Sequence, residues 1–222
     1  MALVIFDCET TSLSGDVVEL GSVIITQSGE KFHFNERCKP IKEPISEGAF
    51  KCHGISNEDV EDCRPSHQVV AEWFQDLQDL NEDLVFCAHN AAFDRRILSQ
   101  HVNLNPYKHF CSLTLAKHRY PEAPNHKLTT LYEELGFTEE MKAHSALDDC
   151  IMLERILERL MGNDTIYDIV NEQLPKMLTE VTFGKHSGKK FVDLPDDYLV
   201  WCRDKHSNRN VAFTAGELLG RR

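Results

Sequence analysis

Four acidic residues and one histidine of this sequence stand where side chains could act together on a metal ion and a proton. Asp7 and Glu9 lie two positions apart, directly after an apolar run that is typical of a buried strand. Because alternate residues of a strand point to the same side, both carboxylates should project from one face. Asp94 and Asp149 each fall in the first turn of a predicted helix, and His144 lies on the loop before the second of these helices. Strand ends and helix starts are the places where α/β folds build their sites.

The types of these side chains indicate metal and acid–base chemistry. Two carboxylates on one face of a strand repel each other unless a positive charge lies between them. Carboxylate oxygens are hard ligands that suit Mg²⁺ or Mn²⁺. A neutral imidazole, with an unperturbed pKa of ~6.5, can accept a proton near neutral pH. Taken singly, a first-turn aspartate needs no such role, because it also interacts favourably with the helix dipole. The prediction therefore depends on the order and spacing of all five residues.

Strands that alternate with helices must position these residues. Short apolar or β-branched runs predict strands at residues 3–6, 17–25, 31–38 and 84–88. Apolar residues at helical spacing predict helices at residues 66–77, 92–98, 113–118, 128–135 and 145–160. The first three strands are expected to be adjacent and antiparallel. Ser145, with Asp148 three residues later, predicts a capping box at the start of the last helix. This succession predicts a mixed α/β layer fold.

The composition is that of an ordinary globular chain with an acidic excess. The chain has 222 residues, of which 41% are apolar, and its formal net charge is −12. Such a charge argues against a protein that simply coats nucleic acid. No stretch approaches the ~20 apolar residues of a membrane-spanning helix, and the first residues lack the basic region of a signal peptide. The 8 cysteines form no CxxC pair, which favours free thiols in a reducing compartment. We therefore expect a cytoplasmic protein without a membrane partner.

The charge is unevenly distributed along the chain. Residues 183–222 hold 8 basic against 5 acidic residues, whereas residues 1–182 hold 16 against 31. Because about forty residues seldom bury a core alone, we expect a main domain at residues 1–180. Residues 181–222 should then form a small module that packs on this domain.

The sequence of this module predicts a hairpin followed by a helix. Glycines punctuate residues 183–191, as in a tight hairpin with a basic tip, and residues 196–205 suit a short helix. Lys185, Lys189 and Lys190 could contact phosphate groups at this tip. The alternative is a hairpin tip whose lysines are only solvated.

Three segments carry a resemblance to a known family. Residues 6–11 (FDCETT), 89–94 (HNAAFD) and 144–149 (HSALDD) resemble the three motifs of the DEDDh exonucleases. These are 3′–5′ exonucleases related to the proofreading subunit of bacterial DNA polymerase III. Residues 52–56 (CHGIS) are similar to the HGI segment of that family, and the match extends from residue 3 to about residue 162. The resemblance implies a ribonuclease H-like mixed sheet flanked by helices, with antiparallel first strands and parallel later ones.

The resemblance also implies a role for each of the five residues. Two Mg²⁺ (or Mn²⁺) ions would neutralise charge on the attacking and leaving oxygens of a phosphodiester. Asp7 would contact both ions, Glu9 and Asp149 would complete one, and Asp94 would orient the other, partly through water. His144 would be the general base that takes a proton from the attacking water.

Contacts to the terminal nucleotide follow from the same resemblance. Thr10 would offer a backbone contact and Leu13 an apolar wedge against the terminal base. His53, Asn90 and Phe93 would line the nucleotide pocket, with the Phe93 ring stacked on a base. For Leu13 and Phe93, a place in the hydrophobic core is the alternative.

The sequence therefore predicts a metal-dependent exonuclease that removes nucleotides from DNA 3′ ends. A first alternative keeps the chemistry and changes the substrate to RNA, because no residue demonstrably probes a 2′-hydroxyl group. A second is a non-catalytic nucleic-acid-binding subunit of a polymerase or repair partner, which the intact set of five motif residues disfavours. The module at residues 181–222 resembles the C-terminal segment of one family member and small stand-alone modules of unknown role. Preference for single or double strands and the oligomeric state stay open.

Overall fold

The computed structural model describes residues 1–139, 141 and 144–221. They pack as two compact units, Met1–Val170 and Asn171–Arg222, called here the N-terminal and the C-terminal unit. The sequence prediction sets this division between residues 180 and 181. In the described ranges, no helix combines the length and the apolar character needed to cross a bilayer.

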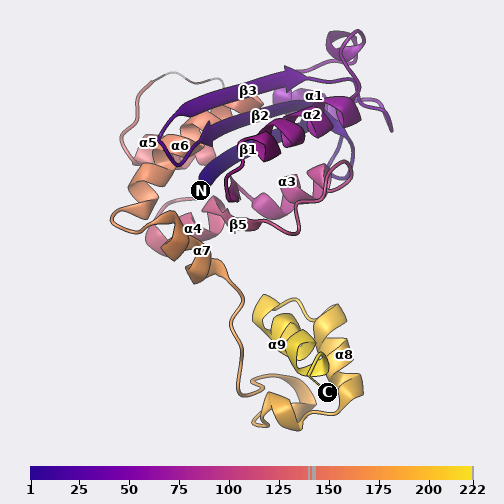
Figure 1. Ribbon diagram of the computed structural model, residues 1–222, viewed down its shortest axis with the longest axis vertical. Helices are drawn as coiled ribbons and strands as arrows, with labels where there is room; N and C mark the ends of the chain where they lie inside the picture. The colour runs from indigo at the N-terminus through magenta and orange to yellow at the C-terminus, as the bar shows by residue number, and fades with distance from the viewer. Residues whose placement is uncertain (140, 142–143, 222) are drawn as a thin grey trace. The chain divides into compact units, whose positions relative to one another are not determined.

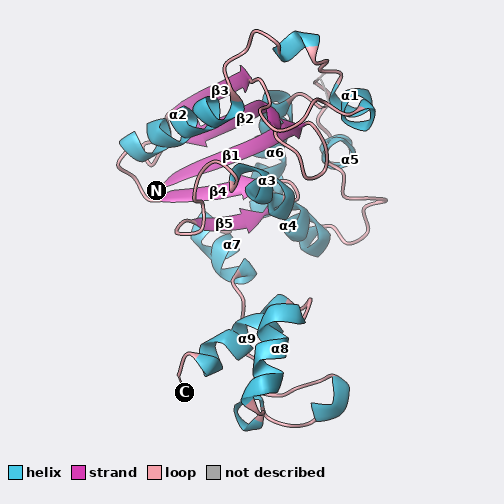
Figure 2. Ribbon diagram, turned by 90° about the vertical axis from the view of Figure 1, so that its right-hand side faces the viewer, coloured by secondary structure: helices cyan, strands magenta, loops and turns pink. Residues whose placement is uncertain are grey.

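The N-terminal unit is built on a five-stranded sheet in the order β3-β2-β1-β4-β5 (Figure 2). Its strands are β1 Ala2–Thr10, β2 Val17–Ile25, β3 Lys31–Arg37, β4 Leu84–Ala88 and β5 Lys108–Cys111. β2 pairs antiparallel with both β1 and β3, whereas β4 runs parallel to β1 and β5 parallel to β4. This arrangement confirms the predicted α/β class and its mixed, ribonuclease H-like sheet. The sequence does not predict β5, because its four residues are too few for a periodic pattern.

Helices lie on both faces of this sheet (Figure 1). Buried residues of α2 and α3 pack on one face, and those of α4, α5, α6 and α7 pack on the other. The helices are α1 Glu47–His53, α2 Ser66–Asp79, α3 Ala91–Leu98, α4 Ser112–Arg119, α5 Leu128–Glu134, α6 Ala146–Met161 and α7 Ile166–Gln173. The five predicted helices are confirmed. The sequence does not predict α1 and α7, which have seven and eight residues.

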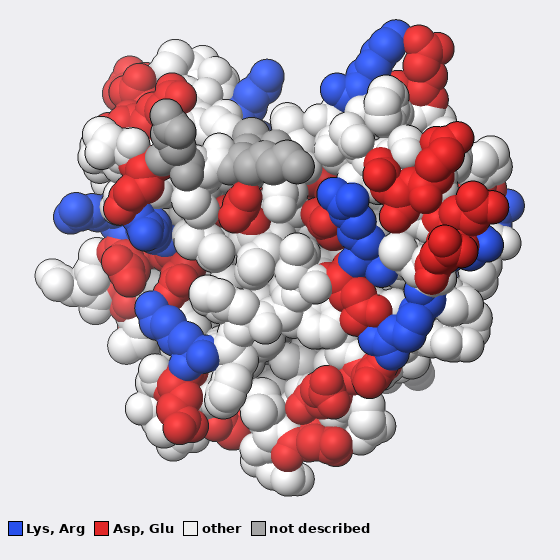
Figure 3. Space-filling model, turned by 90° about the horizontal axis from the view of Figure 1, so that it is seen from above, with Lys and Arg blue, Asp and Glu red and all other residues white. Residues whose placement is uncertain are grey.

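The surface of the protein is predominantly acidic. On the face drawn in Figure 3, Asp and Glu side chains (red) are more widespread than Lys and Arg side chains (blue), and the middle of this face is mainly uncharged. This distribution agrees with the formal net charge of −12. A nucleic acid chain would thus meet an unfavourable field over much of the surface.

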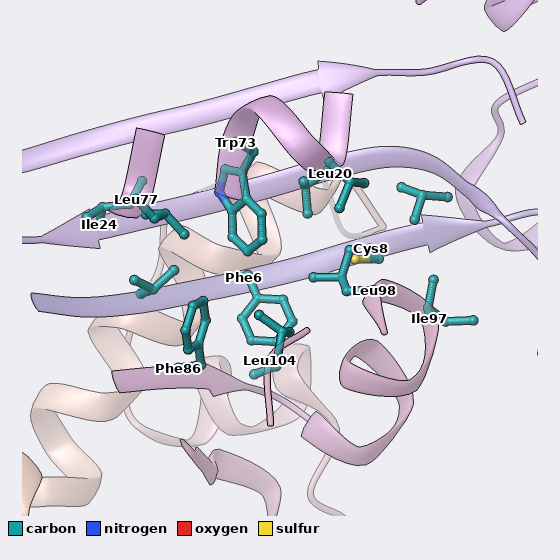
Figure 4. Packing of buried hydrophobic residues seen from close by; sticks show 14 of the residues in the cluster. Phe6, Cys8, Leu20, Ile24, Trp73, Leu77, Phe86, Ile97, Leu98 and Leu104 are labelled. Carbon is teal, nitrogen blue, oxygen red and sulfur yellow. The ribbon is translucent and has the colours of Figure 1, made fainter. Parts of the chain in front are cut away.

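Aromatic packing on the α2 side fixes the central strand β1. The Phe6 ring lies 6.1 Å from the Trp73 ring of α2 and 5.9 Å, edge to face, from the Phe86 ring of β4 (Figure 4). Cys8 points into the same cluster, as expected for the residue between Asp7 and Glu9. Because successive residues of a strand alternate in direction, the two carboxylates project to the opposite face, toward α6.

A glycine lets α6 approach that face closely. Gly21 of β2 is the register partner of Asp7. A Cβ atom added at Gly21 would lie 2.2 Å from the carbonyl carbon of Ala146, the first residue of α6. The backbone of the first turn of α6 therefore rests directly on β2, beside the end of β1.

The C-terminal unit has a hydrophobic cluster of its own. Its helices are α8 Asp196–Lys205 and α9 Arg209–Leu219. The buried members of the cluster are Val181, Phe191, Leu194, Leu199, Cys202, Val211 and Ala215. The predicted helix at residues 196–205 is confirmed, and α9 completes a core that the sequence prediction did not expect. That this unit packs on the N-terminal unit stays a prediction.

The predicted hairpin of this unit takes a different form. Residues 179–191 double back with one antiparallel bridge, between Glu180 and Lys190, but form no strand. The tip is a short 3₁₀ helix, Gly184–His186. Gly184 and Gly188 have φ angles of +60° and +85°, so the glycines of the motif close a tight loop instead of a two-stranded turn.

Candidate active site

The end of β1 and the starts of α3 and α6 bring the four predicted carboxylates together. Asp7 and Glu9 lie on β1 opposite Gly21 and Glu19 of β2. Asp94, in the first turn of α3, is only 2% exposed, which confirms that its carboxylate faces inward, and it accepts a hydrogen bond from the backbone of Cys8.

Burial and mutual repulsion make this cluster costly to ionise. Burial, followed by the charges of Asp94, Asp149 and Glu9, raises the pKa of Asp7 well above its ordinary value. Burial first, and the neighbouring acids second, raise the pKa of Glu9 to about 8. Burial raises the pKa of both Asp94 and Asp149 to about 7. Without a cation, the cluster would therefore retain protons near neutral pH.

His144 joins the cluster from the loop before α6. Ligand atoms of Glu9, His144 and Asp149 lie within 4.8 Å of one another. The backbone of His144 forms a hydrogen bond with the Asp149 carboxylate, and its φ angle is +61°, a conformation that few non-glycine residues adopt. The Nδ1 atom of its exposed ring lies 3.7 Å from Sγ of Cys52 in α1.

The start of α6 is capped from β2, which differs from the prediction. Ser145 occupies the N-cap position but makes no side-chain capping bond. Instead, the Ala146 N–H donates to Oε2 of the buried Glu19 at 3.0 Å, and Nε of Arg37 donates to Oε1 of the same carboxylate at 3.2 Å. Sequence reasoning missed Glu19, although an acidic residue inside an otherwise apolar strand is an indication that could have found it.

A cavity of about 650 Å³ opens beside the carboxylates. Its lining residues are Cys8, Glu9, Thr10, Ser12, Leu13, Ser14, Ser46, Gly48, Ala49, Cys52, His53 and Phe93. Four of the five predicted nucleotide contacts are among them. Leu13 is 82% exposed, so it is not a core residue. Phe93 is partly buried against the core and also lines the cavity.

Helix α3 and the turn that follows it hold the loop that carries Leu13. Nη2 of Arg96 donates to the Leu13 carbonyl oxygen at 2.6 Å, and Nε2 of Gln100 donates to the Gly15 carbonyl oxygen at 2.9 Å. The guanidinium carbon of Arg96 also lies 5.5 Å from the centre of the Phe93 ring. One side of the cavity is thereby tied to the helix that carries Asp94.

Two of the predicted nucleotide contacts, His53 and Asn90, differ in how they relate to the cavity. Nδ1 of His53 accepts from the Ile55 N–H at 3.0 Å, so Nε2 carries the proton and donates to the Thr10 carbonyl oxygen at 3.2 Å. His53 therefore ties the segment after α1 to the end of β1. Asn90 is exposed at the start of α3 with a φ angle of +72° and does not line the cavity.

The three predicted phosphate contacts lie in the other unit. Lys185, Lys189 and Lys190 are all exposed in the loop of the C-terminal unit.

The donor set at the end of β1 fits a divalent cation. Burial raises the pKa of all four carboxylates, and the neighbouring acids raise those of Asp7 and Glu9 further, so the four gain most from a bound positive charge. Their oxygen atoms are the ligands that hard divalent ions prefer.

Comparisons with known proteins agree with this site. The profile of the RNase_T family, described as Exonuclease, matches residues 4–157. A second profile, named for a quorum-sensing-regulated virulence factor, matches residues 164–218. Exodeoxyribonuclease 10 of Escherichia coli is 29% identical over 215 residues, which cover 89% of this chain and 88% of that protein.

Two further relatives cover much of the chain. The solved structure of exonuclease X in complex with 5′ overhanging duplex DNA is 26% identical, with a TM-score of 0.61, and the match covers 76% of this chain and 98% of that chain. The PolC-type DNA polymerase III of Halalkalibacterium halodurans is 30% identical over 82% of this chain, which corresponds to 13% of that polymerase. Because the exonuclease profile spans most of the N-terminal unit, this chain belongs to the exonuclease family, in its divalent-metal-dependent DEDDh class of 3′–5′ phosphodiester hydrolases.

Proposed function

We propose that this protein removes nucleotides one at a time from DNA 3′ ends, with two Mg²⁺ or Mn²⁺ ions held by Asp7, Glu9, Asp94 and Asp149. The main support is the cluster of four carboxylates beside a cavity of about 650 Å³; burial raises the pKa of each, and neighbouring acids raise those of Asp7 and Glu9 further. When bound, the ions would offset the charge that develops on the attacking and leaving oxygens of the phosphodiester.

His144 is the proposed general base. Its imidazole lies with Glu9 and Asp149 in one group of potential ligand atoms within 4.8 Å, so it can accept a proton from a water molecule that attacks there. The hydrogen bond between the His144 backbone and the Asp149 carboxylate couples the position of this loop to a proposed metal ligand.

The cavity is the proposed seat of the terminal nucleotide. Leu13 offers an exposed apolar side chain on one wall, and the Phe93 ring offers an aromatic surface for a base. Thr10 is placed at this wall by the bond between its carbonyl oxygen and His53, so His53 would act mainly by shaping the pocket. Asn90 would meet the nucleotide only at the entrance, because it is exposed and outside the lining.

Two similarities favour DNA over RNA as the substrate. One relative is named an exodeoxyribonuclease and matches most of the chain, and exonuclease X has been solved with duplex DNA. The PolC similarity makes a polymerase a proposed partner, to be sought by co-purification from cells that express the full chain.

The experiment is digestion of matched DNA and RNA strands, labelled at either end, with Mg²⁺, Mn²⁺ or EDTA. We expect 5′-labelled DNA to shorten one nucleotide at a time, 3′-labelled DNA to release mononucleotide at once, and EDTA to stop both reactions. Faster degradation of RNA than of DNA would overturn the substrate class. A cut inside the strand, or removal from the 5′ end, would overturn the proposed reaction.

Asp7→Ala tests the site itself. Turnover should be abolished, because the carboxylate proposed to contact both ions is lost. The fold should survive, because removal of one of several clustered carboxylates relieves repulsion in the metal-free protein. The control is Asp62→Ala, which changes an exposed acid outside the cluster and should leave turnover unchanged. A tenth or more of wild-type activity in Asp7→Ala would show that the metal site is misassigned.

A further inference from the structure

The C-terminal unit carries a row of aromatic rings on its surface. The Tyr198 and Trp201 rings of α8 stack with centroids 5.5 Å apart and an angle of 25° between their planes. Tyr198 meets His186 at 4.4 Å, Trp201 meets His206 at 5.8 Å, and His206 meets Phe183 at 4.2 Å. Five rings, from the loop, from α8 and from His206 directly after α8, thus form one continuous row.

Two rings of this row, Phe183 and Tyr198, pack partly against the hydrophobic cluster of the unit, whereas Trp201 does not belong to that cluster. The inward face of α8 is already supplied by Leu199 and Cys202, both fully buried. Tyr198 and Trp201, three residues apart, share another face of the helix. Trp201 is 45% exposed. A large aromatic side chain left in water beside a satisfied core indicates a binding surface.

Positive charge lies at one end of this aromatic row. Nζ of Lys185 lies 5.7 Å from the centre of the Tyr198 ring. Lys189 and Lys190 are exposed in the same loop, and none of the three lysines forms an ion pair with a described residue. The loop approaches α8 closely at Gly184, since a Cβ atom there would lie 3.1 Å from the Tyr198 hydroxyl oxygen.

The His186 imidazole, which lies between these lysines in the sequence, favours its neutral form. Neither of its nitrogen atoms has a hydrogen-bond partner. Loss of hydration, followed by the charges of Lys189 and Lys185, lowers its pKa, while the carboxylate of Asp197 opposes this change. At neutral pH the ring therefore extends the aromatic row without adding charge.

We propose that the C-terminal unit binds single-stranded nucleic acid, with bases stacked on Trp201 and Tyr198 and phosphates held by Lys185, Lys189 and Lys190. Exposed aromatic rings beside a basic strip are the combination by which proteins hold single strands without reading sequence. The choice of nucleic acid as the ligand rests on the proposed function. Every residue named for this site belongs to the C-terminal unit, whereas the four carboxylates belong to the N-terminal unit.

Tryptophan fluorescence of the full chain can report on this site directly. The chain has two tryptophans; Trp73 is 1% exposed in the core, and Trp201 is 45% exposed. We would titrate the protein with an oligothymidylate of roughly 12 nucleotides, within the usual site size of ~4–16, in EDTA so that no hydrolysis occurs. A stacked base should quench the Trp201 emission and leave that of Trp73 unchanged.

Variants measured with a fluorescently labelled oligothymidylate separate stacking from charge. Trp201→Ala should raise Kd about 10-fold, and Trp201→Phe should restore most of the affinity because a ring is kept. Changing Lys185, Lys189 and Lys190 to Ala should lower the slope of log K against log salt by up to ~2, at ~0.7 per phosphate contact. The matched control is Tyr167→Ala in the N-terminal unit. Tyr167 is 58% exposed and Nζ of Lys108 lies 5.5 Å from the centre of its ring, and its loss should leave Kd unchanged.

The outcomes separate this proposal from the proposed function. Hydrolysis of a small chromogenic phosphodiester in Mg²⁺ should be the same in the Trp201 and lysine variants as in the wild type. Absence of quenching, or equal Kd values for Trp201→Ala and the wild type, would overturn the nucleic-acid site even if the protein digests DNA. Quenching and loss of affinity in Trp201→Ala would support the site even if no digestion occurred, in which case only the proposed function would fail.

Discussion

Gly21→Ala is the substitution that most directly tests how the fold positions the site. Gly21 lies opposite Asp7 on β2, and the added Cβ would fall 2.2 Å from the Ala146 carbonyl carbon and 2.3 Å from the Leu147 backbone nitrogen. Both atoms belong to the helix that carries Asp149. β2 is hydrogen-bonded to a strand on each side, so we expect the first turn of α6 to move and the strand to stay.

The size of the movement follows from these distances. Ordinary van der Waals contact begins at 3.4 Å, so the start of α6 must withdraw by roughly 1 Å, and a displacement of ~1 Å at catalytic groups can lower the rate ~10²-fold. The withdrawal would also lengthen the hydrogen bond from the Ala146 N–H to Glu19. Overpacking of this kind typically costs about 1–3 kcal/mol of unfolding free energy, which leaves a well-folded variant.

The assay compares kcat and KM for a short oligonucleotide, with thermal unfolding followed by circular dichroism. We expect kcat to fall about 10²-fold and KM to change little, because the cavity is lined by other segments. Gly216→Ala is the control, since a Cβ there would have its nearest neighbour at 3.8 Å, and it should keep full activity. A Gly21→Ala enzyme that folds and keeps a kcat within about 3-fold of the wild type would refute the reasoning that close packing of α6 on β2 sets the catalytic geometry.

Three further predictions concern the same cluster. Glu19→Ala should lower kcat more than Glu19→Gln, because only the glutamine keeps an oxygen for the Ala146 N–H, and steady-state kinetics of the two variants measures the difference. His144→Ala should lower kcat ~10²–10⁴-fold with nearly unchanged substrate affinity, and identical pH–rate profiles for the variant and the wild type would remove it from the role of base. Because the folded, metal-free protein holds protons that the unfolded chain releases near pH 4–5, its unfolding free energy should fall as pH rises from about 5 to 8. The slope should be ~1.4 kcal/mol per pH unit for each such proton. Denaturant melts should show this fall of the unfolding free energy without Mg²⁺ and its absence with Mg²⁺. Glu9→Gln should make the slope smaller.

The parts of the site that could be predicted are those set by local pattern. An apolar run that ends in alternating acids fixes β1, Asp7 and Glu9, because the periodicity of a strand determines which side chains share a face. The inward direction of Asp94 follows in the same way from the apolar residues three and four positions later on α3. These inferences needed no knowledge of what lies across the sheet.

The missed features depend on contacts between distant segments. The cap of α6 comes from Glu19, 127 residues earlier in the chain, so local spacing favoured Ser145 instead. Gly21 is special only because the backbone of Ala146 rests on it. The turn at residues 183–191 resembled a hairpin because the same glycines serve both structures, and its 3₁₀ helix lies close to Tyr198 of α8, a contact that local spacing does not reveal.

Helix α3 contributes residues both to the proposed metal site and to the proposed nucleotide cavity. Three residues within one turn of this helix have different roles. Asp94 is a proposed metal ligand, Phe93 lines the cavity, and Arg96 donates a hydrogen bond to the loop that carries Leu13. A nucleotide that shifts or stiffens this turn changes the carboxylate geometry, and an ion that fixes the carboxylate stiffens the cavity. Thermodynamic reciprocity then requires that the nucleotide changes the affinity for the ion by the same factor as the ion changes the affinity for the nucleotide. The geometry of α3 therefore links the affinity for the ions to the presence of a strand end in the cavity.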